Sequence, residues 1–152
     1  MHQILKEGSS EKAIVFDLGG GTLDVTLLNI NKNNDGNVDF DVLATDGNIH
    51  LGWSDFDNKL IDFCINEFCR ETRHPEEEIQ QDKKVCRRLK IKCEHAKKLL
   101  SITQKTVINI DNFYGQNDLM IKINRDTFET IYKDLYGEID KIIISIMEGY
   151  SS

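Results

Sequence analysis

The sequence lacks a long apolar stretch. No segment approaches the about 20 apolar residues that a membrane-spanning helix needs, and residues 1–10 lack the apolar core of a signal peptide. We therefore expect a cytosolic protein with no membrane partner. Basic residues are also few, because 19 Lys and Arg against 26 Asp and Glu give a net charge of −7. This balance excludes nucleic acid or an anionic membrane surface as the main partner.

The four cysteines form no metal-binding motif. Cys64, Cys69, Cys86 and Cys93 contain no Cys-x-x-Cys pair and have no histidine at metal-ligand spacing. They are typical of reduced, helix-borne residues in a reducing compartment. A metal site remains an alternative only if the fold gathers all four.

Three consecutive glycines are the most informative feature of the sequence. Gly19, Gly20 and Gly21 separate two strand-like segments, residues 13–16 and 22–28. No helix start with further glycines or Gly-Lys-Ser/Thr follows, so the loop differs from dinucleotide loops and P-loops. Successive glycine N–H groups in left-handed conformations can hold an anion. The alternative is a tight hairpin in which the glycines serve only the turn.

Polar residues flank the glycines and favour a ligand. Asp17 ends the first strand, and Thr22 and Asp24 begin the second. A purely structural hairpin has no use for two carboxylates and a hydroxyl at one loop, whereas a metal–phosphate ligand uses all three. We expect Asp17 and Asp24 to hold a hydrated Mg²⁺ against phosphates, with Asp17, Thr22 and Asp24 as catalytic candidates.

The rest of the chain alternates between strand and helix patterns. Residues 31–37 predict a turn and residues 38–44 a third strand; a capped helix begins at Ser54. The single proline, Pro75, followed by three glutamates, predicts the start of a second helix that runs to about Ser101.

Residues 105–110 and 119–123 alternate like the strands of a hairpin. Asn124 should cap a last helix with an apolar side, and Gly137 should break or bend it.

The second predicted helix has two faces. Its apolar residues fall within one arc, and the opposite side carries a polar stripe of Glu94, Lys97, Lys98 and Ser101. Spacing alone favours a solvated face with a Glu94–Lys98 ion pair.

Three separated segments resemble one family in the correct order. Residues 17–25 resemble the second phosphate loop of the heat shock protein 70 (DnaK-like) chaperones, whose ATPase domain shares its fold with actin. Residues 45–57, with His50-Leu51-Gly52, and residues 87–101, with Cys93-Glu94, are similar to later segments of that domain. The similarity covers about residues 12–148.

The resemblance implies a fold, a ligand and a set of contact residues. The fold is an α/β actin-like ATPase (ribonuclease H-like) fold, present as a partial second lobe with an antiparallel-rich sheet, a phosphate hairpin and a helical/β subdomain. The ligands are ATP or ADP with Mg²⁺. The nucleotide-binding residues implied are Gly19, Gly20, Gly21, Gly52, Trp53, Glu94, Lys97, Lys98 and Ser101, of which the last four flank the adenosine.

The resemblance also implies a domain organisation. The predicted parts are an N-terminal tail (1–11), a sheet with the phosphate hairpin (12–51), a helix-rich subdomain (52–123), a return helix (124–148) and a short tail (149–152). The first lobe and the peptide-binding domain have no counterpart here, so the family's ATP-dependent protein folding is not expected of this chain alone. We expect a piece that binds nucleotide weakly and cannot hydrolyse it.

Two alternatives stay open. The chain could be a non-catalytic interaction module, or a decayed copy, that keeps the subdomain family members present to nucleotide-exchange factors. Trp53 stands where the family has a second glycine. Its indole could block the nucleotide, stack on it, or be a surface substitution.

Overall fold

The computed structural model describes residues 8–151, which form two compact units. Unit 1 comprises Met1–Trp53 and Tyr136–Ser152, and unit 2 comprises Ser54–Leu135. The first division lies within two residues of the predicted boundary at 51–52. The second falls inside the predicted return helix, so that this helix contributes to both units.

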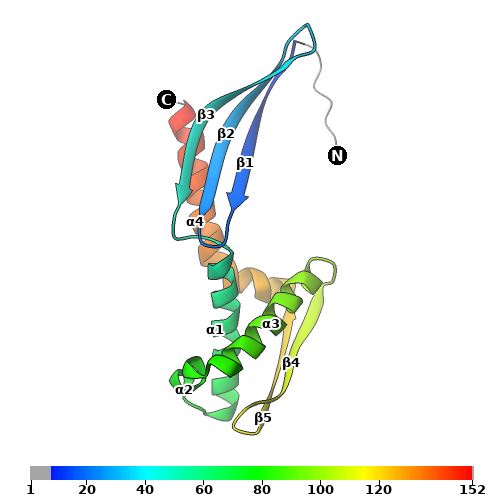
Figure 1. The fold of residues 1–152 in the computed structure, drawn as a ribbon, viewed down its shortest axis with the longest axis vertical. Coiled ribbons are helices and arrows are strands. Elements are labelled where there is room, and N and C mark those ends of the chain that lie inside the picture. Colours follow the sequence, from blue (N-terminus) through cyan, green and yellow to red (C-terminus); the bar gives the residue numbers. More distant parts are fainter. Residues whose placement is uncertain (1–7, 152) are drawn as a thin grey trace. The chain divides into compact units, whose positions relative to one another are not determined.

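Unit 1 is an antiparallel sheet with one helix against it (Figure 1). The sequence patterns predicted three strands, and the structure has β1 (Ser10–Leu18), β2 (Leu23–Lys32) and β3 (Val38–Asn48), which lie in the order β1-β2-β3. β1 starts at Ser10, inside the predicted tail, and β3 runs four residues beyond its predicted end. The tail residues 1–7 and 152 lie outside the described part of the chain.

One face of this sheet is covered by the last part of helix α4 (Arg125–Ser151). Leu23, Val25 and Leu27 alternate along β2 and are buried, as is Ile146 of α4. Period-two alternation places all three β2 residues on the same face, where they form the core with the helix. The opposite face of β2 carries Asp24 and Thr26.

Unit 2 packs helices against a two-stranded hairpin. It contains α1 (Trp53–Thr72) from Ser54 onward, α2 (Glu76–Gln81), α3 (Lys83–Leu100), β4 (Lys105–Tyr114), β5 (Asn117–Asn124) and the start of α4. The apolar arc of α3 is buried as expected: Val85, Leu89, Cys93, Ala96 and Leu100. The cap at Asn124 is also confirmed, because its Oδ1 accepts from the Thr127 N–H at 2.7 Å.

One helix prediction is wrong, and a second is wrong in part. The helix expected from Pro75 to Ser101 is two helices, separated at Asp82, whose backbone is extended and whose side chain accepts from the N–H groups of Lys84 and Val85. Aspartate is a strong N-cap residue, and here the cap starts a new helix rather than lying within one. Gly137 does not break α4, which is continuous there, because a single glycine costs a helix only about 1 kcal/mol. A bend at Gly137 stays a prediction.

No helix of residues 8–151 is both long and apolar enough to cross a membrane.

Candidate functional site

The predicted phosphate loop is the turn between β1 and β2. The strand register places Asp17 opposite Asp24 and Leu18 opposite Leu23. The turn is closed by the Gly19 N–H, which donates to the Thr22 carbonyl at 2.8 Å. The Gly19 amide is therefore committed to the hairpin, and of the three glycines only Gly20 and Gly21 have amides that make no hydrogen bond to another described residue.

The glycine conformations differ from the prediction. Within residues 8–151 only Gly8, Gly36 and Gly115 are glycines with a φ in the left-handed region, so the expectation that the hairpin glycines adopt it is wrong. A turn with negative φ at both central positions needs no glycine for its backbone geometry. The backbone conformation of the turn therefore does not explain why positions 20 and 21 are glycines.

Packing does not explain these two glycines either. A Cβ on Gly20 or Gly21 would meet no atom within 4 Å, whereas one on Gly19 would lie 3.2 Å from Thr22 Oγ1. Two amides that have no partner among residues 8–151 thus border open space at the tip of the hairpin. Glycine at both positions has a physical reason if a ligand lies directly against the backbone, because a Cβ there would keep the ligand away from the amides.

Gly52 and Trp53 support the hairpin. Gly52 is buried, and a Cβ there would lie 2.6 Å from the Gly20 carbonyl carbon and closer still to Gly21 N and Cα. The Trp53 N–H donates to the Gly19 carbonyl at 2.9 Å. Gly52 therefore lets one backbone segment lie directly against the other. The Trp53 residue is 52% exposed.

The two carboxylates of the hairpin are suited to a cation. Asp17 and Asp24 are both exposed and directly opposite in the register, an arrangement that destabilises a sheet unless a positive charge relieves it. The net charge of unit 1 as a whole is also negative. Unit 1 contains 4 Lys and Arg against 11 Asp and Glu, and unit 2 contains 15 of each, so the net charge of −7 belongs to unit 1. Phosphates would be repelled from unit 1 unless a cation accompanied them.

The polar stripe of unit 2 lies on α3 and at its end. Glu94 and Lys97 are partly buried and Lys98 is exposed. Ser101 is the C-cap, and its hydroxyl donates to the Lys97 carbonyl at 3.3 Å. The Glu94–Lys98 ion pair of a solvated face is not among the ion pairs of the described residues.

Lys97 instead forms an ion pair with Asp57 of α1. Sequence reasoning did not select Asp57 as a site residue. Its place in the Asp55-Phe56-Asp57 segment was the available signal, but nothing in the spacing indicates a contact with a residue 40 positions later.

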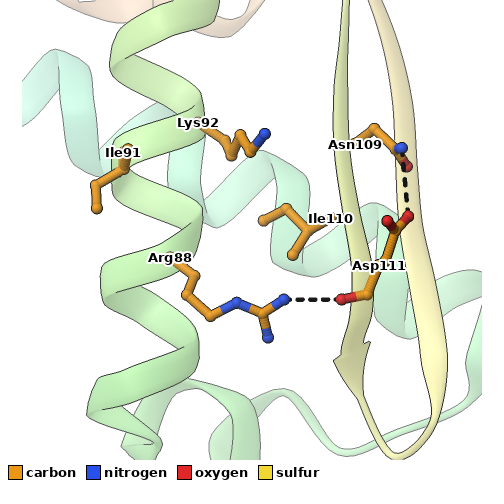
Figure 2. Close-up of a pocket in the computed structure, with 6 residues that line it drawn as sticks. All are labelled: Arg88, Ile91, Lys92, Asn109, Ile110 and Asp111. Atoms are coloured by element: carbon orange, nitrogen blue, oxygen red, sulfur yellow. Dashed lines mark hydrogen bonds between the residues drawn. The ribbon is translucent and has the colours of Figure 1, made fainter.

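Unit 2 also has a shallow hollow between α3 and β4, with a volume of about 420 Å³ (Figure 2). Arg88 and Lys92 provide cations at its edge, and the Arg88 guanidinium donates to the Asp111 carbonyl at 2.7 Å. This hydrogen bond ties α3 to β4. The hollow contains none of the predicted site residues, and a second one beside Phe63 also contains none.

The cysteines do not gather into a metal site. All four are free, and among the described residues no three His, Cys, Asp or Glu side chains are placed to hold a metal ion together. The Cys64 thiol lies beside the Cys93 thiol in the core of unit 2. The hydrogen bond with Cys93, together with burial, raises the pKa of Cys64 far above that of an ordinary thiol.

Comparisons with known proteins agree on one family. The family model described as "Hsp70 protein" matches residues 3–150. Heat shock cognate 70 kDa protein 3 of Dictyostelium discoideum is 41% identical over 135 residues, which are 87% of this chain and 20% of the relative.

Two further relatives give similar values. A heat shock protein of Pyricularia oryzae is 39% identical over 142 residues, which are 91% of this chain and 22% of the relative. A ribosome-associated molecular chaperone of Zygosaccharomyces rouxii is 40% identical over 135 residues, which are 87% of this chain and 21% of the relative. The chain thus spans about a fifth of the length of these curated relatives. It belongs to the Hsp70 family, and its two antiparallel sheets and helices are part of the actin-like ATPase fold of that family.

Proposed function

We propose that the chain binds an adenine nucleotide, ATP or ADP, together with Mg²⁺, as part of an Hsp70-type chaperone. One observation carries the proposal for the phosphates. The Gly20 and Gly21 amides have no partner among the described residues and border open space, next to the facing carboxylates of Asp17 and Asp24.

Each residue of the hairpin has a separate role in this proposal. The Gly20 and Gly21 N–H groups donate to phosphate oxygens, and the Thr22 hydroxyl lies at the same turn. Asp17 and Asp24 hold Mg²⁺ through bound water, because carboxylate oxygens and water are the ligands that this ion prefers. When bound, Mg²⁺ supplies the positive charge that unit 1 lacks. Gly19 and Gly52 shape the hairpin.

In unit 2 we propose that the stripe of Glu94, Lys97, Lys98 and Ser101 contacts the adenosine. Family membership and the position of the four residues on one side of α3 support this. Lys98 offers an ammonium where many members have a planar guanidinium, so stacking on the base should be weaker.

We propose that the parent activity is ATP-dependent protein folding, whereas this chain turns ATP over negligibly. The names of relatives include a molecular chaperone. Phosphoryl transfer needs metal, phosphates and attacking water held in line by donors from several directions. The sequence contains a single glycine triplet, which supplies donors from one direction.

Gly21→Ala tests the proposal. The new methyl group fills the open space over the amide, so we expect at least about a tenfold loss of MgATP affinity by calorimetry, the usual scale for a lost charge-assisted hydrogen bond. The unfolding midpoint should stay the same, because the Cβ meets no protein atom. Gly149→Ala, which also meets nothing, is the control. Unchanged affinity in Gly21→Ala would refute phosphate binding at this turn.

Asp17→Ala addresses the metal. It should remove the dependence of nucleotide binding on Mg²⁺ and lower ATP affinity more than adenosine affinity. Equal losses for both ligands would contradict a metal role at the hairpin.

Trp53→Gly addresses the departure from the family pattern. Tighter MgATP binding by this variant indicates that the indole blocks the ligand, and weaker binding indicates stacking. The exposed indole also allows titration by its own fluorescence.

A second candidate is a non-catalytic module that binds a partner such as a nucleotide-exchange factor. It is favoured by α3, which carries eight Lys and Arg and one Glu and therefore suits an acidic surface. An absence of MgATP affinity in both the natural chain and Trp53→Gly, with salt-dependent binding of an acidic exchange factor, would favour this candidate.

A further inference from the structure

β1 lies at the edge of the three-stranded sheet of unit 1 (Figure 1). It pairs with β2 on one side and with no strand of residues 8–151 on the other. Its middle part, residues 13–16, is the apolar segment Ala-Ile-Val-Phe. Such a segment is typical of a strand inside a sheet, covered on both faces, and an edge strand that contains one is a template for pairing with another chain.

The side chains in the middle of β1 are open to solvent on both faces of the sheet. Ile14 and Phe16 lie on the face that α4 covers over β2, yet they are 37% and 46% exposed. Val25, the register partner of Phe16, is only 1% exposed. Val15 lies on the opposite face and is 47% exposed. The cover that α4 provides is therefore far less complete over β1 than over β2.

Every second residue of β1 directs its backbone N–H and C=O groups away from β2. The Gly19 N–H donates to the Thr22 carbonyl, which makes these two residues a hydrogen-bonded pair of the hairpin. Hydrogen-bonded pairs alternate with the other kind along an antiparallel ladder, so the odd-numbered residues of β1 face β2. Ile14 and Phe16 direct their backbone groups to the edge, where an added strand would bind them.

The opposite edge of the sheet is protected against such pairing. β3 carries Asp39, Asp41 and Asp46, and its register with β2 shifts between Leu27 and Leu28. Charged side chains and bulges on an edge strand both oppose the addition of a further strand. β1 has charged residues only toward its ends, and its register with β2 has no shift. The sheet thus has one edge that favours association.

β1 is self-complementary in one antiparallel register. A register centred on Val15 places Val15 opposite Val15 of the second copy and Ile14 opposite Phe16, twice by symmetry. Pairs of an aromatic and a β-branched residue stabilise a sheet, and no two like charges lie directly opposite in this register. A register centred on Ile14 would instead place Glu11 opposite Asp17, and this like-charge pair opposes association.

We propose that two copies of this chain associate through β1, antiparallel about a two-fold axis at Val15, so that their sheets continue as one sheet of six strands. The pairing satisfies the backbone groups at the edge and buries apolar surface on both faces. A single pair of strands is a small interface, and each unit 1 has a net charge of −7. The dimer should therefore be weak, with a dissociation constant on the order of 10 µM.

Sedimentation velocity of the whole chain tests the dimer. The natural chain should pass from monomer to dimer between roughly 1 and 300 µM, in about 0.3 M salt that screens the repulsion. Val15→Lys should weaken the dimer at least about tenfold, because two ammonium groups would lie opposite each other at the axis. Val42→Lys is the matched control, since Val42 is an exposed valine on the other edge strand. It should change the dissociation constant by less than about twofold.

A charge-reversed partner tests the position of the axis. Val15→Glu alone should also weaken the dimer at least about tenfold, because two carboxylates would then face each other. An equimolar mixture of Val15→Lys and Val15→Glu should form a heterodimer, since opposite charges meet at the axis. A variant in which β1 merely unfolds would not be rescued in this way.

Amide hydrogen exchange tests the strand pairing itself. The Ile14 and Phe16 amides should exchange slowly only at concentrations at which the dimer forms, because their N–H groups point to the edge. The Val15 amide, which faces β2, should be protected in the monomer and the dimer alike.

Each measurement has an outcome that would overturn the inference. A natural chain that stays monomeric up to about 300 µM would refute the dimer. A dimer that persists in Val15→Lys, or that Val42→Lys weakens equally, would show that the contact lies elsewhere. A mixture without heterodimer would refute the axis at Val15, and exchange at Ile14 and Phe16 that is independent of concentration would refute the strand pairing. The inference does not depend on nucleotide binding, which is tested separately.

Discussion

Replacement of Gly52 by alanine should distort the turn that carries Gly20 and Gly21. The new Cβ would lie 2.6 Å from the Gly20 carbonyl carbon and even closer to Gly21 N and Cα. Carbon atoms in contact are normally about 3.5 Å or more apart, so one backbone segment must move by about 1 Å. All the atoms in the way belong to the main chain, and no side chain can rotate aside.

The expected magnitude follows from this clash. Over-packing of a well-packed site typically costs about 1–3 kcal/mol, and a clash with main chain on one rigid turn belongs at the upper end. The φ of Gly52 lies outside the left-handed region, so alanine adds no conformational strain of its own. For a chain of this size, about 3 kcal/mol lowers the melting temperature by roughly 6–12 °C.

The assay combines thermal unfolding followed by circular dichroism with the amide signals of Gly20 and Gly21 in ¹H–¹⁵N spectra. Gly52→Ala should lower the melting temperature and shift both signals. Gly20→Ala is the matched control, since its Cβ meets nothing within 4 Å, and it should melt within about 2 °C of the natural chain. A Gly52→Ala protein with natural stability and unchanged amide signals would refute the close approach of the two segments.

Three further predictions concern stability. Asp82→Ala should lower the free energy of unfolding by about 1 kcal/mol, because it removes the acceptor for the Lys84 and Val85 N–H groups, and denaturant titration measures the loss. Gly137→Ala should raise it by up to about 1 kcal/mol in the same assay, since α4 is continuous there and a Cβ meets no atom; a lower value would show that packing needs the glycine. The raised pKa of Cys64 means that the folded state keeps this thiol protonated while the unfolded state ionises it near about pH 8.5. The protonated Cys64 thiol therefore makes its full contribution to the free energy of unfolding below that pH, and this contribution is lost as the pH rises further. The free energy of unfolding of Cys64→Val should accordingly fall less than that of the natural chain between about pH 8 and 10. An identical dependence on pH in the two proteins would contradict this.

Periodicity in the sequence determined most of the elements and their buried faces. The alternation of polar and apolar residues over 22–28 indicated a strand, and the arc from Val85 to Leu100 indicated the apolar side of a helix. Both patterns depend only on the geometry of a single element, which is why they could be recognised without a structure. The break at Asp82 was local as well, and its capping signal was available in the sequence but was assigned to the helix interior.

The tertiary structure alone decided which groups of the site are available to a ligand. The sequence offered three equivalent glycine amides, but the bond from Gly19 to Thr22 leaves two. The sequence predicted Gly52 as a ligand contact, which stays a prediction, but it did not show that Gly52 lies against Gly21. It also gave no sign of the pair between Lys97 and Asp57. These contacts join residues that lie far apart in the chain. They depend on how whole elements pack together, and no local pattern of residues records that packing.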